Sequence, residues 1–139
     1  MSSDSRPGRY KSAGLIVWGV LHVLWPVVLF ARPTVSRSEL LVSIVVGIVV
    51  GPLVIAAGYD KLPTGACFSV GVIELLNVGS LIQAASSEAF FFNIAPQAAG
   101  EVAVMNLVVV VLLFDRGLKT EIKTISEVFS PDSSETEVQ

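Results

Sequence analysis

The sequence predicts an all-α membrane protein, a four-helix transmembrane bundle with short loops. Of its 139 residues, 53% are hydrophobic and only 15% are charged. The hydrophobic residues gather in four stretches with little charge, each about as long as the ~20-residue helix that crosses a ~30 Å hydrocarbon core. The predicted spans are residues 13–31, 40–58, 65–85 and 98–114.

The basic residues predict the orientation of these spans. Arg32 and Arg37 lie between the first two spans, and none of the nine basic residues lies between the last two. Segments on the inner side of a membrane carry an excess of Lys and Arg. We therefore expect an integral membrane protein with both termini inside. The remaining basic residues, all on the expected inner side, are Arg6, Arg9, Lys11, Lys61, Arg116, Lys119 and Lys123.

The first span follows a polar segment, residues 1–12, that we expect to be a disordered inner tail. Pro26 lies past the middle of the span and removes one backbone hydrogen bond, so a kink is expected there. Arg32-Pro33 ends the span.

The second span carries no charge, and Ser38 is its expected N-cap. Gly47 and Gly51 lie four residues apart, a spacing that lets a second helix approach closely in lipid. We expect this face to pack within the bundle rather than between copies. Gly71 in the third span is a further expected packing position.

The third span follows a tight inner turn at residues 59–63. Cys67, near its start, is the only cysteine and is interpreted as a small buried filler, since alone it forms neither an intrachain disulfide nor a zinc cluster. The outer connection before the fourth span carries Phe90, Phe91 and Phe92, which we interpret as an interfacial aromatic belt.

Residues 115–129 show an amphipathic helical pattern. Leu118, Ile122, Ile125 and Phe129 recur at helical spacing, with charged residues on the other faces. We expect this helix to lie along the inner leaflet, with its lysines near anionic headgroups. The alternative is that it docks on a partner or on a second copy. The charged residues on the other faces of this helix are Lys119, Glu121, Lys123 and Glu127. Residues 130–139 are expected to form an acidic, solvated tail.

A buried polar layer is the candidate site. His22, Glu74, Asn77 and Asn106 all lie within about one turn of the predicted bilayer centre, and Glu101 lies nearer the outer surface. Ionisable groups at this depth are expensive and are a functional-site hypothesis by default.

Two interpretations of the layer remain open. In the first, Glu74 binds protons, and together with His22 and Glu101 forms a relay toward the outer face. In the second, the same side chains only hydrogen-bond between helices, each contributing ~0.6–2 kcal/mol. Small four-span transporters of the multidrug-resistance type also depend on a buried glutamate, but theirs lies in the first span, so the likeness is one of format.

Catalytic and cofactor motifs are absent from the sequence. There is no nucleophile elbow, glycine-rich phosphate loop or paired-histidine motif, and one histidine alone does not hold a haem or a metal. We expect no enzyme, no cofactor, no metal and no nucleic-acid binding. The expected partners are the lipid bilayer and a second copy or another membrane protein.

The chain resembles the small four-span membrane proteins of halophilic archaea and of their pleomorphic enveloped viruses. The shared features are valine-rich spans, minimal loops, few lysines and Ser/Asp/Glu-rich ends at residues 2–5 and 132–137. This resemblance implies a non-enzymatic structural or assembly protein, such as an internal, matrix-like protein of a halophilic virus envelope. The alternative function is a small proton-coupled transporter or channel that uses Glu74.

Overall fold

The computed structural model describes residues 6–32, 36–88, 90 and 94–129, and these residues form four helices and their connections. All four helices are long and apolar enough to cross a membrane. The all-α prediction with four candidate spans is therefore confirmed for the described residues. The helices are α1 (Arg6–Phe30), α2 (Arg37–Gly58), α3 (Thr64–Ser86) and α4 (Pro96–Phe129).

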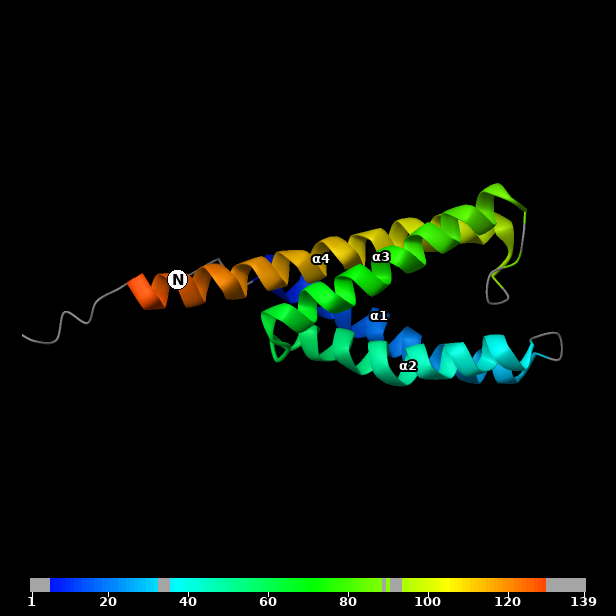
Figure 1. The fold of residues 1–139 in the computed structure, drawn as a ribbon, viewed down its shortest axis with the longest axis horizontal. Coiled ribbons are helices and arrows are strands. Elements are labelled where there is room, and N and C mark those ends of the chain that lie inside the picture. The colour runs from blue at the N-terminus through cyan, green and yellow to red at the C-terminus, as the bar shows by residue number, and fades with distance from the viewer. Residues whose placement is uncertain (1–5, 33–35, 89, 91–93, 130–139) are drawn as a thin grey trace, which may run out of the picture.

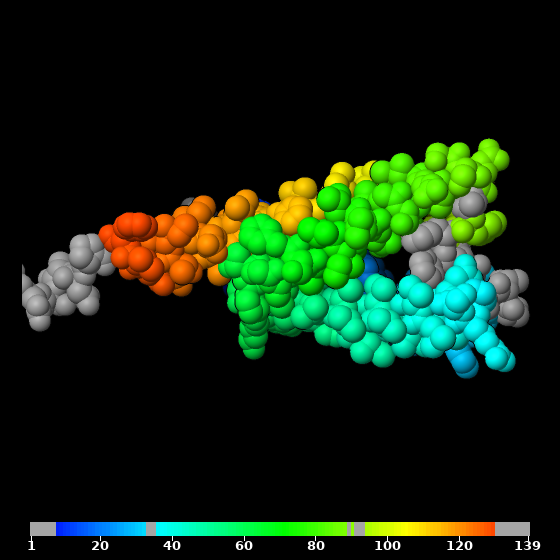
Figure 2. Space-filling view, viewed as in Figure 1, coloured from blue at the N-terminus to red at the C-terminus, as the bar shows by residue number. Residues whose placement is uncertain are grey.

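The helices are arranged as two hairpins, α1 with α2 and α3 with α4 (Figure 1). The hairpins meet near the turn 59–63 that joins α2 to α3, and they diverge toward the opposite end of the molecule. We call the end with this turn the closed end. The end that carries Phe30, Arg37, Ser86 and Pro96 is the open end, and Figure 2 shows the gap there between α2 and α3.

In the first hairpin the two backbones touch through glycine. A Cβ atom added to Gly51 would lie 2.9 Å from the carbonyl oxygen of Gly19, and one added to Gly47 would lie 2.7 Å from that of His22. Real Cβ atoms do not approach backbone this closely, so both sites require glycine. Gly47 and Gly51 thus lie where α1 and α2 of the same molecule approach each other most closely.

In the second hairpin, aromatic rings fill the spaces beside glycine. The ring of Phe114 lies against Gly71, and the ring of Phe68 lies against Gly117. The two rings also pack against each other, with centroids 5.7 Å apart. The neighbour of Gly71 is thus an aromatic side chain on α4.

The hydrophobic core follows the same division. One buried cluster draws residues from all four helices, including Leu15, Val54, Cys67 and Leu113, and joins the hairpins. A second cluster, around Leu81 and Ala103, belongs to α3 and α4 alone. Cys67 is buried in the first cluster, as its interpretation as a filler predicts.

The helix boundaries differ from the prediction in three places. Residues 6–12, expected in a disordered tail, are the first turns of α1. The cap of α2 is Ser36 rather than Ser38, and with Glu39 it forms a reciprocal capping box. Residues 115–129 are not a separate helix, because α4 continues through them without a break.

The expectations for the aromatic belt and for the C-terminal tail fall largely on residues that the structure does not describe. Phe90 is exposed at the open end, whereas Phe91 and Phe92 lie outside the described residues. The tail 130–139 also lies outside them. α1 continues as helix through Pro26, which packs against Gly47.

Candidate functional site: a cleft between the hairpins

A cleft of about 410 Å³ lies between the two hairpins and is lined by residues of all four helices. Its walls are mainly apolar and include the rings of Trp18 and Trp25 of α1. His22, Glu74 and Asn77 lie among the lining residues. A mostly apolar cavity with a few convergent polar groups is the usual form of a binding site for a small molecule.

The buried carboxylate of this cleft is Glu74, and its partner comes from the other hairpin. The side chain of Glu74 on α3 is only 1% exposed, and its Oε1 lies 3.0 Å from Nε2 of His22 on α1. Within the described part of the chain, neither Oε1 nor Oε2 has a hydrogen-bond partner of good geometry, and Oε1 alone contacts an ionisable group. One carboxylate oxygen therefore contacts the opposite hairpin, and the other has unused acceptor capacity in the site.

A hydrogen bond between Glu74 and His22 requires a proton on either Oε1 or Nε2, in addition to the one on Nδ1 of His22. Nδ1 of His22 lies 3.2 Å from the carbonyl oxygen of Trp18, and because a carbonyl only accepts, Nδ1 carries a hydrogen and donates it. Nε2 and Oε1 then attract each other only when one more proton sits on one of them. The pair so formed carries no net charge, which suits burial in an apolar cleft.

Asn106 lies in the same layer but has a local role. Its side chain is fully buried, and its Nδ2 donates a 3.1 Å hydrogen bond to the carbonyl oxygen of Glu74. This bond joins α4 to α3 and fixes the backbone that carries Glu74. Asn106 therefore helps to position Glu74 through its backbone, on the side of α3 that packs against α4.

Of the other two predicted residues, Asn77 lies at the cleft and Glu101 does not. Asn77 lies one helical turn from Glu74, is partly exposed and lines the cleft. Glu101 is exposed, near the start of α4, and is not among the residues lining the cleft. A relay that includes Glu101 therefore has no support in this geometry, and the structure brings together His22, Glu74, Asn77 and Asn106.

Several cleft residues were not singled out from the sequence. Ser43 of α2 and Ser80 of α3 add hydroxyl groups to the lining, and Trp18 packs at a tilted angle on the His22 ring, with centroids 5.7 Å apart. Nε1 of Trp18 is buried and lacks a hydrogen-bond partner in the described residues. The sequence feature that could have identified this wall of the cleft is the spacing of Trp18, His22 and Trp25, which recur every three to four residues on one face of α1.

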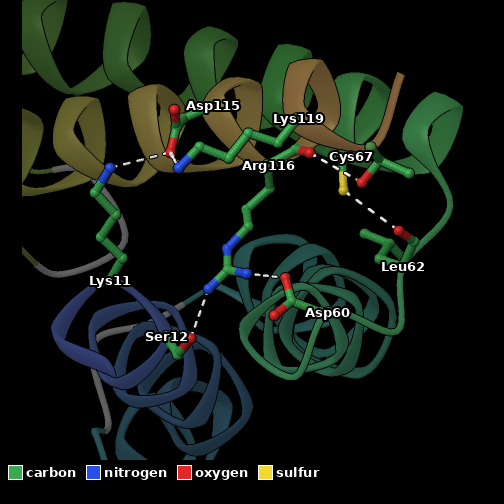
Figure 3. Close-up of polar contacts among 9 residues, drawn as sticks. Lys11, Ser12, Asp60, Leu62, Cys67, Asp115, Arg116 and Lys119 are labelled. Atoms are coloured by element: carbon green, nitrogen blue, oxygen red, sulfur yellow. Dashed lines mark hydrogen bonds and ion pairs between the residues drawn. The ribbon is translucent and has the colours of Figure 1, made fainter. Parts of the chain in front are cut away.

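The closed end is held by ion pairs that connect the helices (Figure 3). Arg116 of α4 contacts Asp60 in the turn 59–63 and donates to the hydroxyl of Ser12 of α1. Lys11 of α1 lies 3.1 Å from the Asp115 carboxylate of α4. Asp60 takes a left-handed backbone conformation, with φ 56°, which aspartate tolerates better than most residues. Polar groups therefore bridge the hairpins where the cleft ends.

Metal ligation finds no support in the described ranges, where no three His, Cys, Asp or Glu side chains cluster closely enough to hold an ion. Comparison with known protein families, curated protein sequences and solved structures finds no match to the chain.

Proposed function

We propose that the protein is an integral membrane carrier that moves a small, mainly apolar solute in step with protons. The observation behind this proposal is the Glu74–His22 pair, which is buried, lines the cleft and joins the two hairpins. A pair that shares one proton changes its attraction when a proton is gained or lost, so protonation and the position of the hairpins are coupled.

The cleft geometry supports a carrier better than an open channel. The hairpins separate at the open end and are bridged at the closed end by Arg116, Asp60, Ser12, Lys11 and Asp115. A site reached from one side at a time is what alternating access requires. The excess of Lys and Arg near the closed end supports placing that end, with both termini, on the inner side.

The solute class follows from the lining. Trp18, Trp25 and aliphatic side chains would contact an apolar body, while Glu74 Oε2 and Asn77 would hold one polar group. Ser43 and Ser80 add further hydrogen-bonding capacity at the wall. The proposed solute is therefore a small amphipathic molecule with a hydrogen-bond donor.

The test is proton movement in liposomes loaded with a pH-sensitive dye. Glu74→Gln keeps the shape of the side chain but removes its titration, so the variant should assemble while solute-dependent proton movement falls to background. Glu101→Gln is the matched control, because Glu101 is exposed and lies outside the cleft; it should move protons like the wild type. Equal movement in wild type and Glu74→Gln, or none in either across a tested pH range and solute panel, would reject the carrier.

A second candidate is a structural or assembly protein of a membrane, for example the inner face of a viral envelope. The observation that favours it is the end of α4, residues 118–129, which extends beyond the other helices and is exposed throughout. Such a segment offers a surface for assembly contacts on the inner side. Recovery of the chain in stoichiometric amounts from purified particles would support this role, and trace recovery from a cell membrane would count against it.

A further inference from the structure

The mouth of the cleft lies between apolar side chains at the depth of the lipid chains. Val42 of α2 and Leu76 of α3 line the cleft and are 50% and 70% exposed. Figure 2 shows the gap between these two helices toward the open end. Gly47 lies near the middle of α2, and Val42 lies five residues, or ~8 Å, from it. This distance is within the ~15 Å half-thickness of a hydrocarbon core, so a spanning α2 places the mouth inside the bilayer.

The lining carries no charge apart from the pair of Glu74 and His22. Besides the two tryptophans, the other polar lining residues are Ser43, Asn77 and Ser80, and within the described part of the chain the lining holds no Lys, Arg or Asp. The pair is neutral as a unit when it shares one proton. A charged head group would have to displace that proton or leave its own charge unbalanced in an apolar cleft. The lining therefore favours a neutral solute.

The cleft also holds a polar donor and a polar acceptor without partners. Nε1 of Trp18 and Oε2 of Glu74 are buried and make no hydrogen bond among the described residues. Both side chains contact the ring of His22: the Trp18 ring packs on it with centroids 5.7 Å apart, and Oε1 of Glu74 lies 3.0 Å from its Nε2. The unused donor and the unused acceptor therefore lie in the same part of the cleft.

A hydroxyl group matches these two unused atoms. It donates one hydrogen and also accepts, so a single functional group has the chemistry to pair with Nε1 of Trp18 and with Oε2 of Glu74. An ammonium group only donates and a carboxylate only accepts, so each of them leaves one side of the site unpaired. Buried polar atoms without partners are costly, and an occupant that pairs with both is favoured over one that does not.

We propose that the cleft binds a lipid-soluble alcohol taken from the bilayer, with its hydroxyl at Trp18 and Glu74 and its apolar chain in the mouth between α2 and α3. This inference rests on the proposed function, because it names the class of solute that the same cleft would carry. The chain contacts Val42 and Leu76 on entry and meets lipid beyond them, so it does not cross water. The hydroxyl leaves the proton shared by Glu74 and His22 in place.

Tryptophan fluorescence tests the binding directly, because both tryptophans of the chain, Trp18 and Trp25, line the cleft. The probes are an alcohol, an amine and a carboxylic acid with the same single brominated chain, since bromine quenches tryptophan on contact. Each is added to the full chain in phosphatidylcholine nanodiscs. The alcohol should quench at a concentration at least about tenfold lower than either other probe.

The donor at Trp18 is tested by the ratio of alcohol to amine binding within one variant. Trp18→Phe keeps a ring but removes Nε1, so the preference for the alcohol should fall severalfold. Trp25→Phe is the matched control and should keep the preference, because Nε1 of Trp25 is not among the buried atoms without a partner. The ratio does not depend on which tryptophan remains as the reporter.

The mouth is tested by two pairs of substitutions. Val42→Phe with Leu76→Phe narrows the mouth and should weaken quenching by the alcohol severalfold. Val45→Phe with Leu75→Phe adds the same rings at exposed positions outside the lining and should leave quenching unchanged. Equal quenching by the three probes, as expected if an ordered water pairs with the unused atoms, would overturn the proposal. An undiminished preference in Trp18→Phe, or equal effects of the two double variants, would also overturn it.

These measurements use no pH gradient, so their failure is distinguishable from failure of the carrier. An alcohol that binds as described while Glu74 moves no protons would reject the carrier and leave this site standing. Proton movement that depends on Glu74, without any preference for the alcohol, would reject this site alone.

Discussion

Contacts within each hairpin differ from contacts between the hairpins. Within a hairpin the two helices lie together along their length, through bare backbone at Gly19 and Gly51 or through the rings of Phe68 and Phe114. Between hairpins, the polar contacts of the described residues lie at the closed end and at the Glu74–His22 pair. The molecule is therefore built as two firm units joined at one end, an arrangement that lets a cleft between them change width without unfolding either unit.

The largest expected effect comes from separating α1 from α2. Gly51→Leu places a side chain where even a Cβ would lie 2.9 Å from the Gly19 carbonyl oxygen, so the helices must move apart. We expect a loss of at least ~3 kcal/mol in the free energy of unfolding, measured by thermal or denaturant unfolding in detergent. Gly79→Leu is the control, because a Cβ there meets nothing within 4 Å. Equal stability of the two variants would show that the glycine contact is not what holds the first hairpin.

A smaller effect is expected from the hydrogen bond inside the second hairpin. Asn106→Leu removes the donor to the Glu74 carbonyl oxygen and should cost ~1 kcal/mol of unfolding free energy. Asn77→Leu should cost less, because no hydrogen bond of the Asn77 side chain is present among the described residues. The same unfolding assay ranks the two, and a larger loss for Asn77→Leu would contradict this division of roles.

The smallest effect on stability is expected at the closed end. Arg116→Gln removes the contact with Asp60 and the hydrogen bond to Ser12; because Asp60 is 65% exposed and the glutamine amide can still donate, its cost should stay at or below about 1 kcal/mol. The end should nevertheless loosen, and Cys67, buried beside it, should react severalfold faster with a maleimide. Lys123→Gln removes an exposed ion pair near the end of α4 and should leave this rate unchanged. Identical rates in both variants would show that Arg116 does not hold the hairpins together.

The fold was predictable to the extent that apolar length and composition determine helices. All four candidate spans are found, and depth along the spans was enough to select His22, Glu74 and Asn106 as one layer. Helix ends were less predictable, because Ser36 and Ser38 are both good caps and only the reach of Glu39 back to Ser36 decides between them.

The cleft could not be predicted from the sequence. Its existence depends on how far two hairpins diverge, and no local pattern encodes that distance. The contact of Arg116 with Asp60 has the same origin, since it requires α4 to pass beside the turn 59–63. Gly19 was overlooked because its importance appears only once its neighbour, Gly51, is known.

The proposed coupling of protons to the cleft is tested most directly by the distance between hairpins at the open end. Spin labels at Ser38 on α2 and Gln83 on α3, both exposed, report that distance in the Cys67→Ser background by pulsed electron resonance. In the protein with Glu74 and His22, the distance distribution should change when the pH is lowered until the pair gains a proton, or raised until it loses the shared one. Either change weakens the contact between the two side chains. With Glu74→Gln it should stay the same across the pH range. A distance that ignores pH in both proteins, or that responds equally in both, would contradict the coupling.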